Sequence, residues 1–131
     1  MTSITIIGGS VAGFQTAIHL KRHGLDVNLI EEHSEIGKPH KCAGLISSAG
    51  AKELGLDLDD LIVNKIKGAR IHSPFGTELQ IKKDDVALVI DREKLDKKLY
   101  YKAKMLGCDI KLGTSLINKR NETLFVQKEE H

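Results

Sequence analysis

Residues 4–13 read ITIIGGSVAG, and this stretch decides the fold. The apolar, β-branched residues before the glycines predict a strand, and the apolar spacing after them predicts a helix. The helix is expected to end near Gly24, and residues 27–30 (VNLI) predict a second strand that closes with Glu31. Strand, tight turn, helix and strand in this order form one βαβ unit.

The turn inside this unit is typical of dinucleotide recognition. Gly8 allows a sharp turn, the small Ser10 lets backbone approach a pyrophosphate, and Gly13 lets the helix pack closely on the strands. Free N–H groups and the helix dipole favour the anion. Glu31 can accept hydrogen bonds from a ribose diol. Because serine replaces the usual middle glycine, weaker binding is expected, and a packing turn without a ligand is the alternative.

Length and composition indicate an ordinary soluble domain. The chain has 131 residues, 40% hydrophobic and 29% charged, with a net charge of +2, and we interpret residues 1–131 as one domain. The near-neutral charge and the scarcity of aromatic side chains argue against nucleic-acid binding. No run is long enough to span a bilayer and the N-terminus does not resemble a signal peptide, so we expect a cytoplasmic protein. Cys42 and Cys108 lie in different contexts and form neither a metal pair nor a disulfide framework.

The segment after Glu31 predicts a long loop over residues 32–48. It contains glycines, a proline and a cationic cluster of Lys38, His40 and Lys41 around Cys42. Loops of this length in a small domain are usually functional or disordered, and we favour a functional loop. A short helix is then expected over residues 49–54.

Residues 61–89 predict a β-rich insertion. An imperfect strand ending at His72, a turn at residues 73–76 (SPFG) and an alternating stretch at residues 78–81 indicate a hairpin. Residues 87–90 predict a third short strand.

The second half contains one clear helix, for which Asp91 is a good N-cap. Leu95, Leu99, Ala103 and Leu106 recur at helical spacing and predict one buried stripe. The strand expected at residues 109–112 would then lie parallel to the second strand. A closing antiparallel pair is expected at residues 114–118 and 123–127.

These elements predict the α/β class, as a partial Rossmann-like three-layer dinucleotide-binding domain: a parallel sheet with an added antiparallel hairpin or meander. The first strand would have neighbours on one side only. Because a bare apolar edge invites association, we expect the closing hairpin, a partner chain or strand swapping to cover it.

Three stretches resemble the geranylgeranyl reductase family: residues 6–13, residues 37–47 (GKPHKCAGLIS) and residues 91–99 (DREKLDKKL), together with Glu31. The family consists of FAD-dependent oxidoreductases of the p-hydroxybenzoate hydroxylase type, whose archaeal members saturate the isoprenoid chains of membrane lipids. The cysteine block is much more specific to these reductases than the glycine motif. The likeness covers almost the whole chain, which matches only the first third or so of such an enzyme, without its substrate domain.

The resemblance implies that FAD is the cofactor and that its pyrophosphate and ribose lie along the βαβ unit. Cys42 would lie near the flavin or its ribityl chain, and Arg92 would reach the cofactor from the start of its helix. The alternatives to contact with the cofactor are structural roles: Cys42 would be a small buried hydrophobic residue, and Arg92 an exposed cation at the helix end. The full set of cofactor-binding candidates is Gly8, Ser10, Ala12, Gly13, Glu31, Cys42, Ala43, Gly44, Arg92 and Leu116, the last beside the adenine.

The function implied is the FAD-binding N-terminal region of a geranylgeranyl-reductase-like flavoprotein, with little or no catalysis of its own and no identified catalytic residue. Peripheral membrane contact through a lipid substrate is consistent with this. The alternatives are a small NAD(H)- or ADP-binding module or regulatory subunit, and a structural fragment without a ligand; Glu31 disfavours NADP. No metal site is expected, because His33, His40 and His72 lack ligand spacing.

Overall fold

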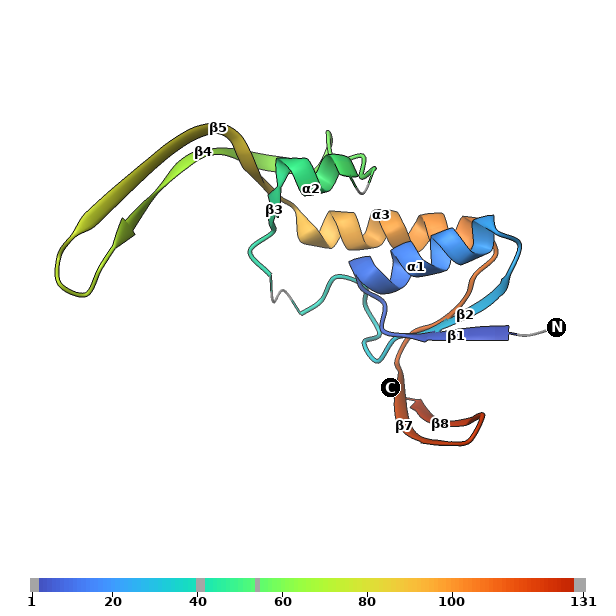
Figure 1. Cartoon of the computed structure of the whole chain (residues 1–131). Coiled ribbons are helices and arrows are strands. Elements are labelled where there is room, and N and C mark those ends of the chain that lie inside the picture. The colour runs from blue at the N-terminus through green and yellow to red at the C-terminus, as the bar shows by residue number, and fades with distance from the viewer. Residues whose placement is uncertain (1–2, 40–41, 54, 129–131) are drawn as a thin grey trace. The chain divides into compact units, whose positions relative to one another are not determined.

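The computed structural model describes residues 3–39, 42–53 and 55–128. It divides into two compact units. Figure 1 shows the whole chain, coloured by residue number from blue at the N-terminus to red at the C-terminus. The first unit comprises Met1–His40 and Glu93–His131, and the second comprises Lys41–Arg92. Each unit has its own sheets and is described by itself.

The first unit contains the predicted parallel sheet. Its strands are β1 (Ser3–Ile7), β2 (Asp26–Ile30) and β6 (Asp109–Lys111), in the order β1-β2-β6, and both pairings are parallel. Helix α1 (Val11–Arg22) joins β1 to β2, and α3 (Arg92–Met105) leads into β6. The predicted βαβ unit and the third parallel strand are therefore confirmed.

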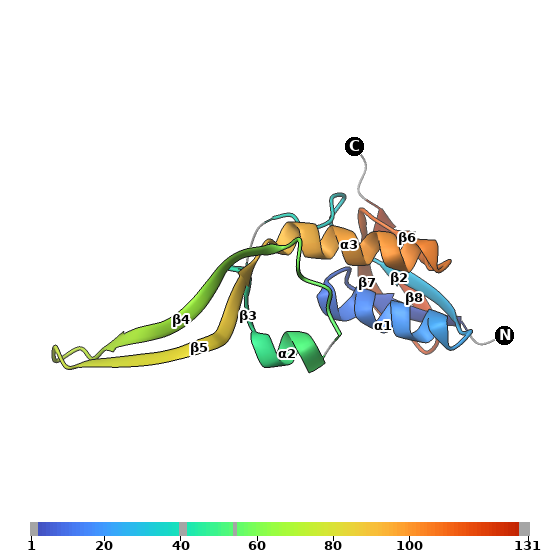
Figure 2. The ribbon, with the colours of Figure 1, turned by 90° about the horizontal axis from the view of Figure 1, so that it is seen from above.

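The two helices and the sheet enclose the core of this unit. Figures 1 and 2 show α1 and α3 side by side over one face of the sheet. The rings of Phe14 on α1 and Tyr100 on α3 make a T-shaped contact, with 5.9 Å between their centroids. The prediction for Leu106 is wrong, because α3 ends at Met105 and this side chain is 39% exposed. None of the described helices is both long and apolar enough to cross a membrane. The buried core residues of α1, β2 and α3 are Phe14, Ala17, Ile18, Val27, Leu29, Ile30, Leu95, Leu99 and Ala103.

The closing hairpin is also present, but it does not cover the edge of β1. Strands β7 (Thr114–Arg120) and β8 (Thr123–Lys128) pair with each other as a separate two-stranded sheet, on the face opposite the helices (Figure 1). Among the described residues, β1 pairs only with β2. The first of the three predicted ways to cover this edge is therefore wrong, since the hairpin pairs within itself.

The second unit is built on a long antiparallel hairpin, seen along its length in Figure 2. It contains β3 (Leu45–Ser47), α2 (Ser48–Glu53), β4 (Ile62–His72) and β5 (Glu78–Ile90), with the sheet order β3-β5-β4. The predicted hairpin and short helix are confirmed, although position 54 lies outside the described residues.

The separate third strand predicted at residues 87–90 is wrong. These residues are the end of β5, which runs unbroken for 13 residues and pairs with both β3 and β4. The β4–β5 pairing absorbs two register shifts, the second between Ile66 and Gly68. The irregular sequence of this segment therefore reflects bulges in one continuous ladder.

Candidate dinucleotide site

The glycine turn joins the end of β1 to the start of α1. Gly8 has a φ of +105°, in the left-handed region that favours glycine, and its N–H donates to Ile30 O at 2.8 Å. Phe14 N donates to Ser10 O at 2.9 Å and closes the first turn of α1. The turn is thus bonded to both the strand end beside it and the helix it begins.

Gly13 lies where no side chain fits. A Cβ at this position would be 1.9 Å from the carbonyl oxygen of Gly8, which is a backbone atom. At Gly9 a Cβ would lie 3.1 Å from Glu31 Cβ and 3.1 Å from Phe14 Cζ. The helix therefore packs directly on the turn, as the prediction for Gly13 required.

The N-terminus of α1 has the properties of an anion site. Ser10 is the N-cap residue, but its side chain makes no capping hydrogen bond, and the first turn of the helix contains no acidic residue. The first N–H groups of a helix have no partner within it, and the dipole adds positive potential there. The exposed Ser10 hydroxyl and these N–H groups can together receive a phosphate.

The Glu31 carboxylate closes the site from the end of β2. Its Oε2 accepts a hydrogen bond from Gly9 N at 2.5 Å, and its Oε1 accepts from His33 N at 2.8 Å and from His33 Nδ1 at 2.6 Å. The residue is only 8% exposed. Its carboxylate therefore links the glycine turn to the segment after β2.

The same contacts determine the charge of Glu31. Burial opposes ionisation, but the hydrogen bonds from the His33 and Gly9 N–H groups and from the His33 ring outweigh it, so the pKa of Glu31 is lowered. Glu31 is consequently a carboxylate that accepts hydrogen bonds and donates none.

Replacing Glu31 by glutamine is expected to lower the free energy of unfolding by about 2 kcal/mol at neutral pH, because the part-buried N–H donors of Gly9 and His33 lose an ionised acceptor. The folded-state pKa is depressed, so the stabilisation is fully present above the ordinary value of 4.5 and is lost as the pH falls through the folded pKa. Urea denaturation of both proteins at a series of pH values measures the difference. Glu122→Gln, the same change in the exposed turn after β7, is the control and should shift stability by less than about 0.5 kcal/mol. A difference for Glu31→Gln that persists unchanged in acid would contradict the assignment.

The backbone of Glu31 is fixed as firmly as its side chain. Its N–H donates to Lys111 O at 2.9 Å, and its carbonyl oxygen accepts from Thr114 N at 2.9 Å. Gly113 N donates to His33 O at 3.1 Å. The segment that carries the predicted ribose acid is thus held by the connection between β6 and β7.

His33 is the residue of this site that sequence reasoning missed. His33 lacks the sequence spacing of a metal ligand, and within the described ranges no three His, Cys, Asp or Glu side chains are grouped to hold a metal ion. The available signal was its position two residues beyond a strand-ending acid, where the chain can turn back on the carboxylate.

In the second unit, the structure brings Cys42 and Arg92 together. Arg92 Nη1 donates to Cys42 Sγ at 3.3 Å, and Gly44 N donates to the same sulfur at 3.4 Å. Cys42 is exposed, so its interpretation as a small buried hydrophobe is wrong. Arg92 is half-buried, and its guanidinium contacts this sulfur at the start of α3.

Gly44 fixes the backbone beside this pair. It has a φ of +74°, and a Cβ there would lie 2.1 Å from the carbonyl oxygen of Ile90. Ile90 N donates to Gly44 O at 2.9 Å. The cysteine loop is thereby attached to the end of β5, while Ala43 is exposed between its neighbours.

The predicted cofactor residues fall into the two units. Leu116, on β7 and 37% exposed, belongs to the first unit. His40 and Lys41, part of the predicted cationic cluster, lie outside the described residues. Gly8, Ser10, Ala12, Gly13, Glu31 and Leu116 belong to the first unit, and Cys42, Ala43, Gly44 and Arg92 to the second. Contact of each with a cofactor stays a prediction.

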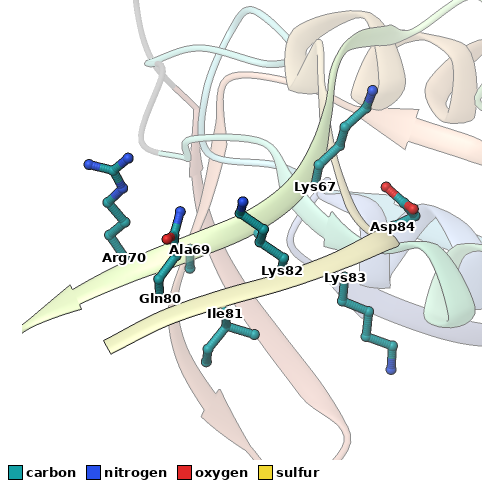
Figure 3. A pocket seen from close by; sticks show the side chains of 9 residues that line it. Lys67, Ala69, Arg70, Gln80, Ile81, Lys82, Lys83 and Asp84 are labelled. Atoms are coloured by element: carbon teal, nitrogen blue, oxygen red, sulfur yellow. The ribbon is translucent and has the colours of Figure 1, made fainter. Parts of the chain in front are cut away.

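A positively charged recess lies on the β4–β5 hairpin, and none of the predicted cofactor-binding residues lines it. Figure 3 shows Lys67, Arg70 and Lys82 on one side of the two strands, with Ile81 and Lys83 on the other. It forms at the bulge next to Gly68, whose Cβ would lie 2.3 Å from Ile81 O. The lining residues are Lys67, Gly68, Ala69, Arg70, Gln80, Ile81, Lys82, Lys83 and Asp84.

Curated relatives match nearly all of the chain. It is 34% identical over 130 residues to digeranylgeranylglycerophospholipid reductase 1 of Methanosphaera stadtmanae, covering 95% of this chain and 32% of that protein. It is 36% identical over 109 residues to reductase 2 of Methanothermobacter thermautotrophicus, covering 82% and 28%. The chain therefore spans about a third of the length of these relatives. No family model matches it.

Solved structures agree with this likeness. A geranylgeranyl bacteriochlorophyll reductase-like protein from Thermoplasma acidophilum superposes with a TM-score of 0.76 at 29% identity, covering 94% of this chain and 34% of that one. A flavin-dependent brominase superposes with a TM-score of 0.69 at 24% identity, over 98% of this chain and 35% of that one, which is evidence for the fold alone. The predicted Rossmann-like α/β fold class is thereby confirmed.

Proposed function

Because the chain is homologous to the N-terminal part of the digeranylgeranylglycerophospholipid reductases, we propose that it binds FAD as the N-terminal region of a geranylgeranyl-reductase-like flavoprotein. The observation that carries the proposal is the βαβ turn, in which Gly13 admits no Cβ and Glu31 stands at the end of β2. The sequence likeness selects FAD among the dinucleotides that such a turn can hold.

The residues of the first unit fit the ADP half of FAD. The N-terminal N–H groups of α1 and the uncapped hydroxyl of Ser10 would hold the pyrophosphate. The Glu31 carboxylate would accept hydrogen bonds from the adenosine ribose, and Leu116 would offer apolar surface to the adenine. In the second unit, Cys42 and Arg92 are proposed to lie near the flavin or its ribityl chain.

The complete enzyme would reduce isoprenoid double bonds. When bound, FAD supplies hydride transfer to carbon, and the protein binds and orients it. This chain spans about a third of its relatives, and we assign to it the binding of the cofactor. The edge of β1 that pairs with no described strand is proposed to pair with a second chain or a second copy, because unpaired strand edges associate readily.

The test is titration of the purified chain with FAD, NAD and ADP by calorimetry, after recording its visible absorption for retained flavin. FAD is expected to bind most tightly. Glu31→Gln is expected to weaken FAD binding by about tenfold or more, because a hydrogen bond to a charged acceptor is lost. The control Glu122→Gln should bind FAD as the unaltered chain does.

A colourless protein that fails to bind added FAD would contradict the proposal. A preference for NAD over FAD would instead favour the small NAD(H)- or ADP-binding module. That alternative draws support from one observation: all the residues suited to the ADP moiety lie in the first unit.

A further inference from the structure

The Glu31 carboxylate has few acceptor positions left for a ligand. Two carboxylate oxygens offer about four lone-pair positions. Gly9 N–H takes one on Oε2, while His33 N–H and His33 Nδ1 take two on Oε1. About one position, on Oε2, remains.

In the hydrogen bond between the His33 ring and Glu31 Oε1, the ring is the donor, through Nδ1–H. An ionised carboxylate has only lone pairs to offer, and an unprotonated Nδ1 at 2.6 Å would repel it. The lowered pKa of Glu31 agrees with an ionised carboxylate. The ring nitrogen therefore fills an acceptor position in the same way that a ligand hydroxyl would.

Of the three donors on Glu31, the His33 ring is the one that can move. Gly9 N–H belongs to the turn that Gly8 anchors on Ile30 O, and the His33 backbone is bonded to Gly113 N at 3.1 Å. The His33 side chain, by contrast, is 38% exposed. Its Nδ1 also lies 3.9 Å from Glu32 Oε1, so a second carboxylate is close when the ring turns.

A ribose cis-diol carries two O–H donors, one more than the carboxylate can accept with the ring in place. We propose that the His33 imidazole occupies the acceptor position of one ribose hydroxyl and turns away when a diol-bearing adenine nucleotide binds. This inference rests on the proposed function. His33 is then a specificity-determining residue that limits the affinity of the site for the ribose diol.

The experiment compares the affinity for ADP of the unaltered chain and of His33→Ala by calorimetry, with 2′,3′-dideoxy-ADP as the ligand that lacks the diol. His33→Ala is expected to bind ADP about threefold to tenfold more tightly, because one net hydrogen bond no longer has to be broken. Its affinity for dideoxy-ADP should be unchanged. His72→Ala removes another exposed histidine, on β4, and should bind both ligands as the unaltered chain does.

A second measurement needs no substitution. The 15N resonance of His33 Nδ1 in the unaltered chain is expected to shift on addition of ADP, as the ring leaves the carboxylate, and to stay in place with dideoxy-ADP. This readout remains informative if His33→Ala does not fold.

The outcomes separate the inference from the proposed function. If the unaltered chain binds ADP and His33→Ala binds it equally or more weakly, the inference is overturned and the proposed function stands. ADP binding by His33→Ala alone supports the inference. If neither protein binds ADP but the unaltered chain binds FAD, the inference is overturned and the proposed function stands. If FAD does not bind either, both are overturned.

Discussion

Replacing Gly13 by alanine is expected to lower the free energy of unfolding by at least about 3 kcal/mol. The added Cβ would lie 1.9 Å from Gly8 O and 3.1 Å from Gly8 C, so backbone must shift to admit it. That shift disturbs the bond from Gly8 N to Ile30 O. Urea denaturation followed by circular dichroism measures the loss, and binding of ADP by any folded fraction should also be abolished.

Gly24→Ala is the matched control for this substitution. Gly24 also lies in the first unit and has a φ of +75°, but a Cβ there meets nothing within 4 Å. It should cost only about 1 kcal/mol, from backbone strain alone. Equal losses for the two variants would show that the contact with Gly8 O does not determine the stability of the turn.

The second large effect is expected for Gly44→Ala, in the second unit. Here strain and collision add, since φ is +74° and the Cβ would lie 2.1 Å from Ile90 O. We expect a loss of about 3 kcal/mol or more. Because Ile90 N donates to Gly44 O, the Ile90 amide should lose its protection against hydrogen exchange, which NMR measures residue by residue.

Gly76→Ala provides the control within the same unit. Gly76 has a φ of +83° at the turn between β4 and β5, and a Cβ there meets nothing within 4 Å. It should cost about 1 kcal/mol and leave the Ile90 amide protected. An Ile90 amide that stays protected in Gly44→Ala would contradict the proposed attachment of the cysteine loop.

Most of the first unit could be predicted because its signals are local. The pattern of adjacent residues predicts the strand and turn of residues 4–13 and the helix that follows them. The buried stripe of Leu95, Leu99 and Ala103 likewise follows helical spacing. The prediction that Leu106 belongs to this stripe was wrong, because the helix ends at Met105, one residue before it, and residue spacing does not show where a helix ends.

The features that were not predicted depend on residues far apart in the sequence. The bond from Gly9 N to the Glu31 carboxylate spans 22 positions, and nothing in either local pattern indicates it. Likewise, β5 continues past the predicted break because β4 pairs with it on both sides of the register shift between Ile66 and Gly68, and β3 pairs with its end at residues 87–89. The contact of the His33 ring with Glu31 is the exception, because it joins residues two positions apart and its signal was the strand-ending acid just before it.

The cysteine site shows what a family resemblance adds to physical reasoning. Cys42 and Arg92 are 50 positions apart, and no spacing rule joins them. The resemblance placed both beside one cofactor, and the structure places Arg92 Nη1 3.3 Å from Cys42 Sγ. The proximity within the second unit is thus established, and contact with the flavin stays a prediction.

The Glu31 carboxylate also bears on how such chains diverge. Its hydrogen bonds to Gly9 and His33 stabilise the folded chain whether or not a nucleotide is bound. A descendant that had lost its cofactor would therefore still be under selection to keep this acid, since losing it would cost stability. Ser10, whose hydroxyl makes no capping bond, is under no such structural constraint. Substitution of Ser10 together with retention of Glu31 would therefore indicate a lineage that kept the fold after it stopped binding the nucleotide.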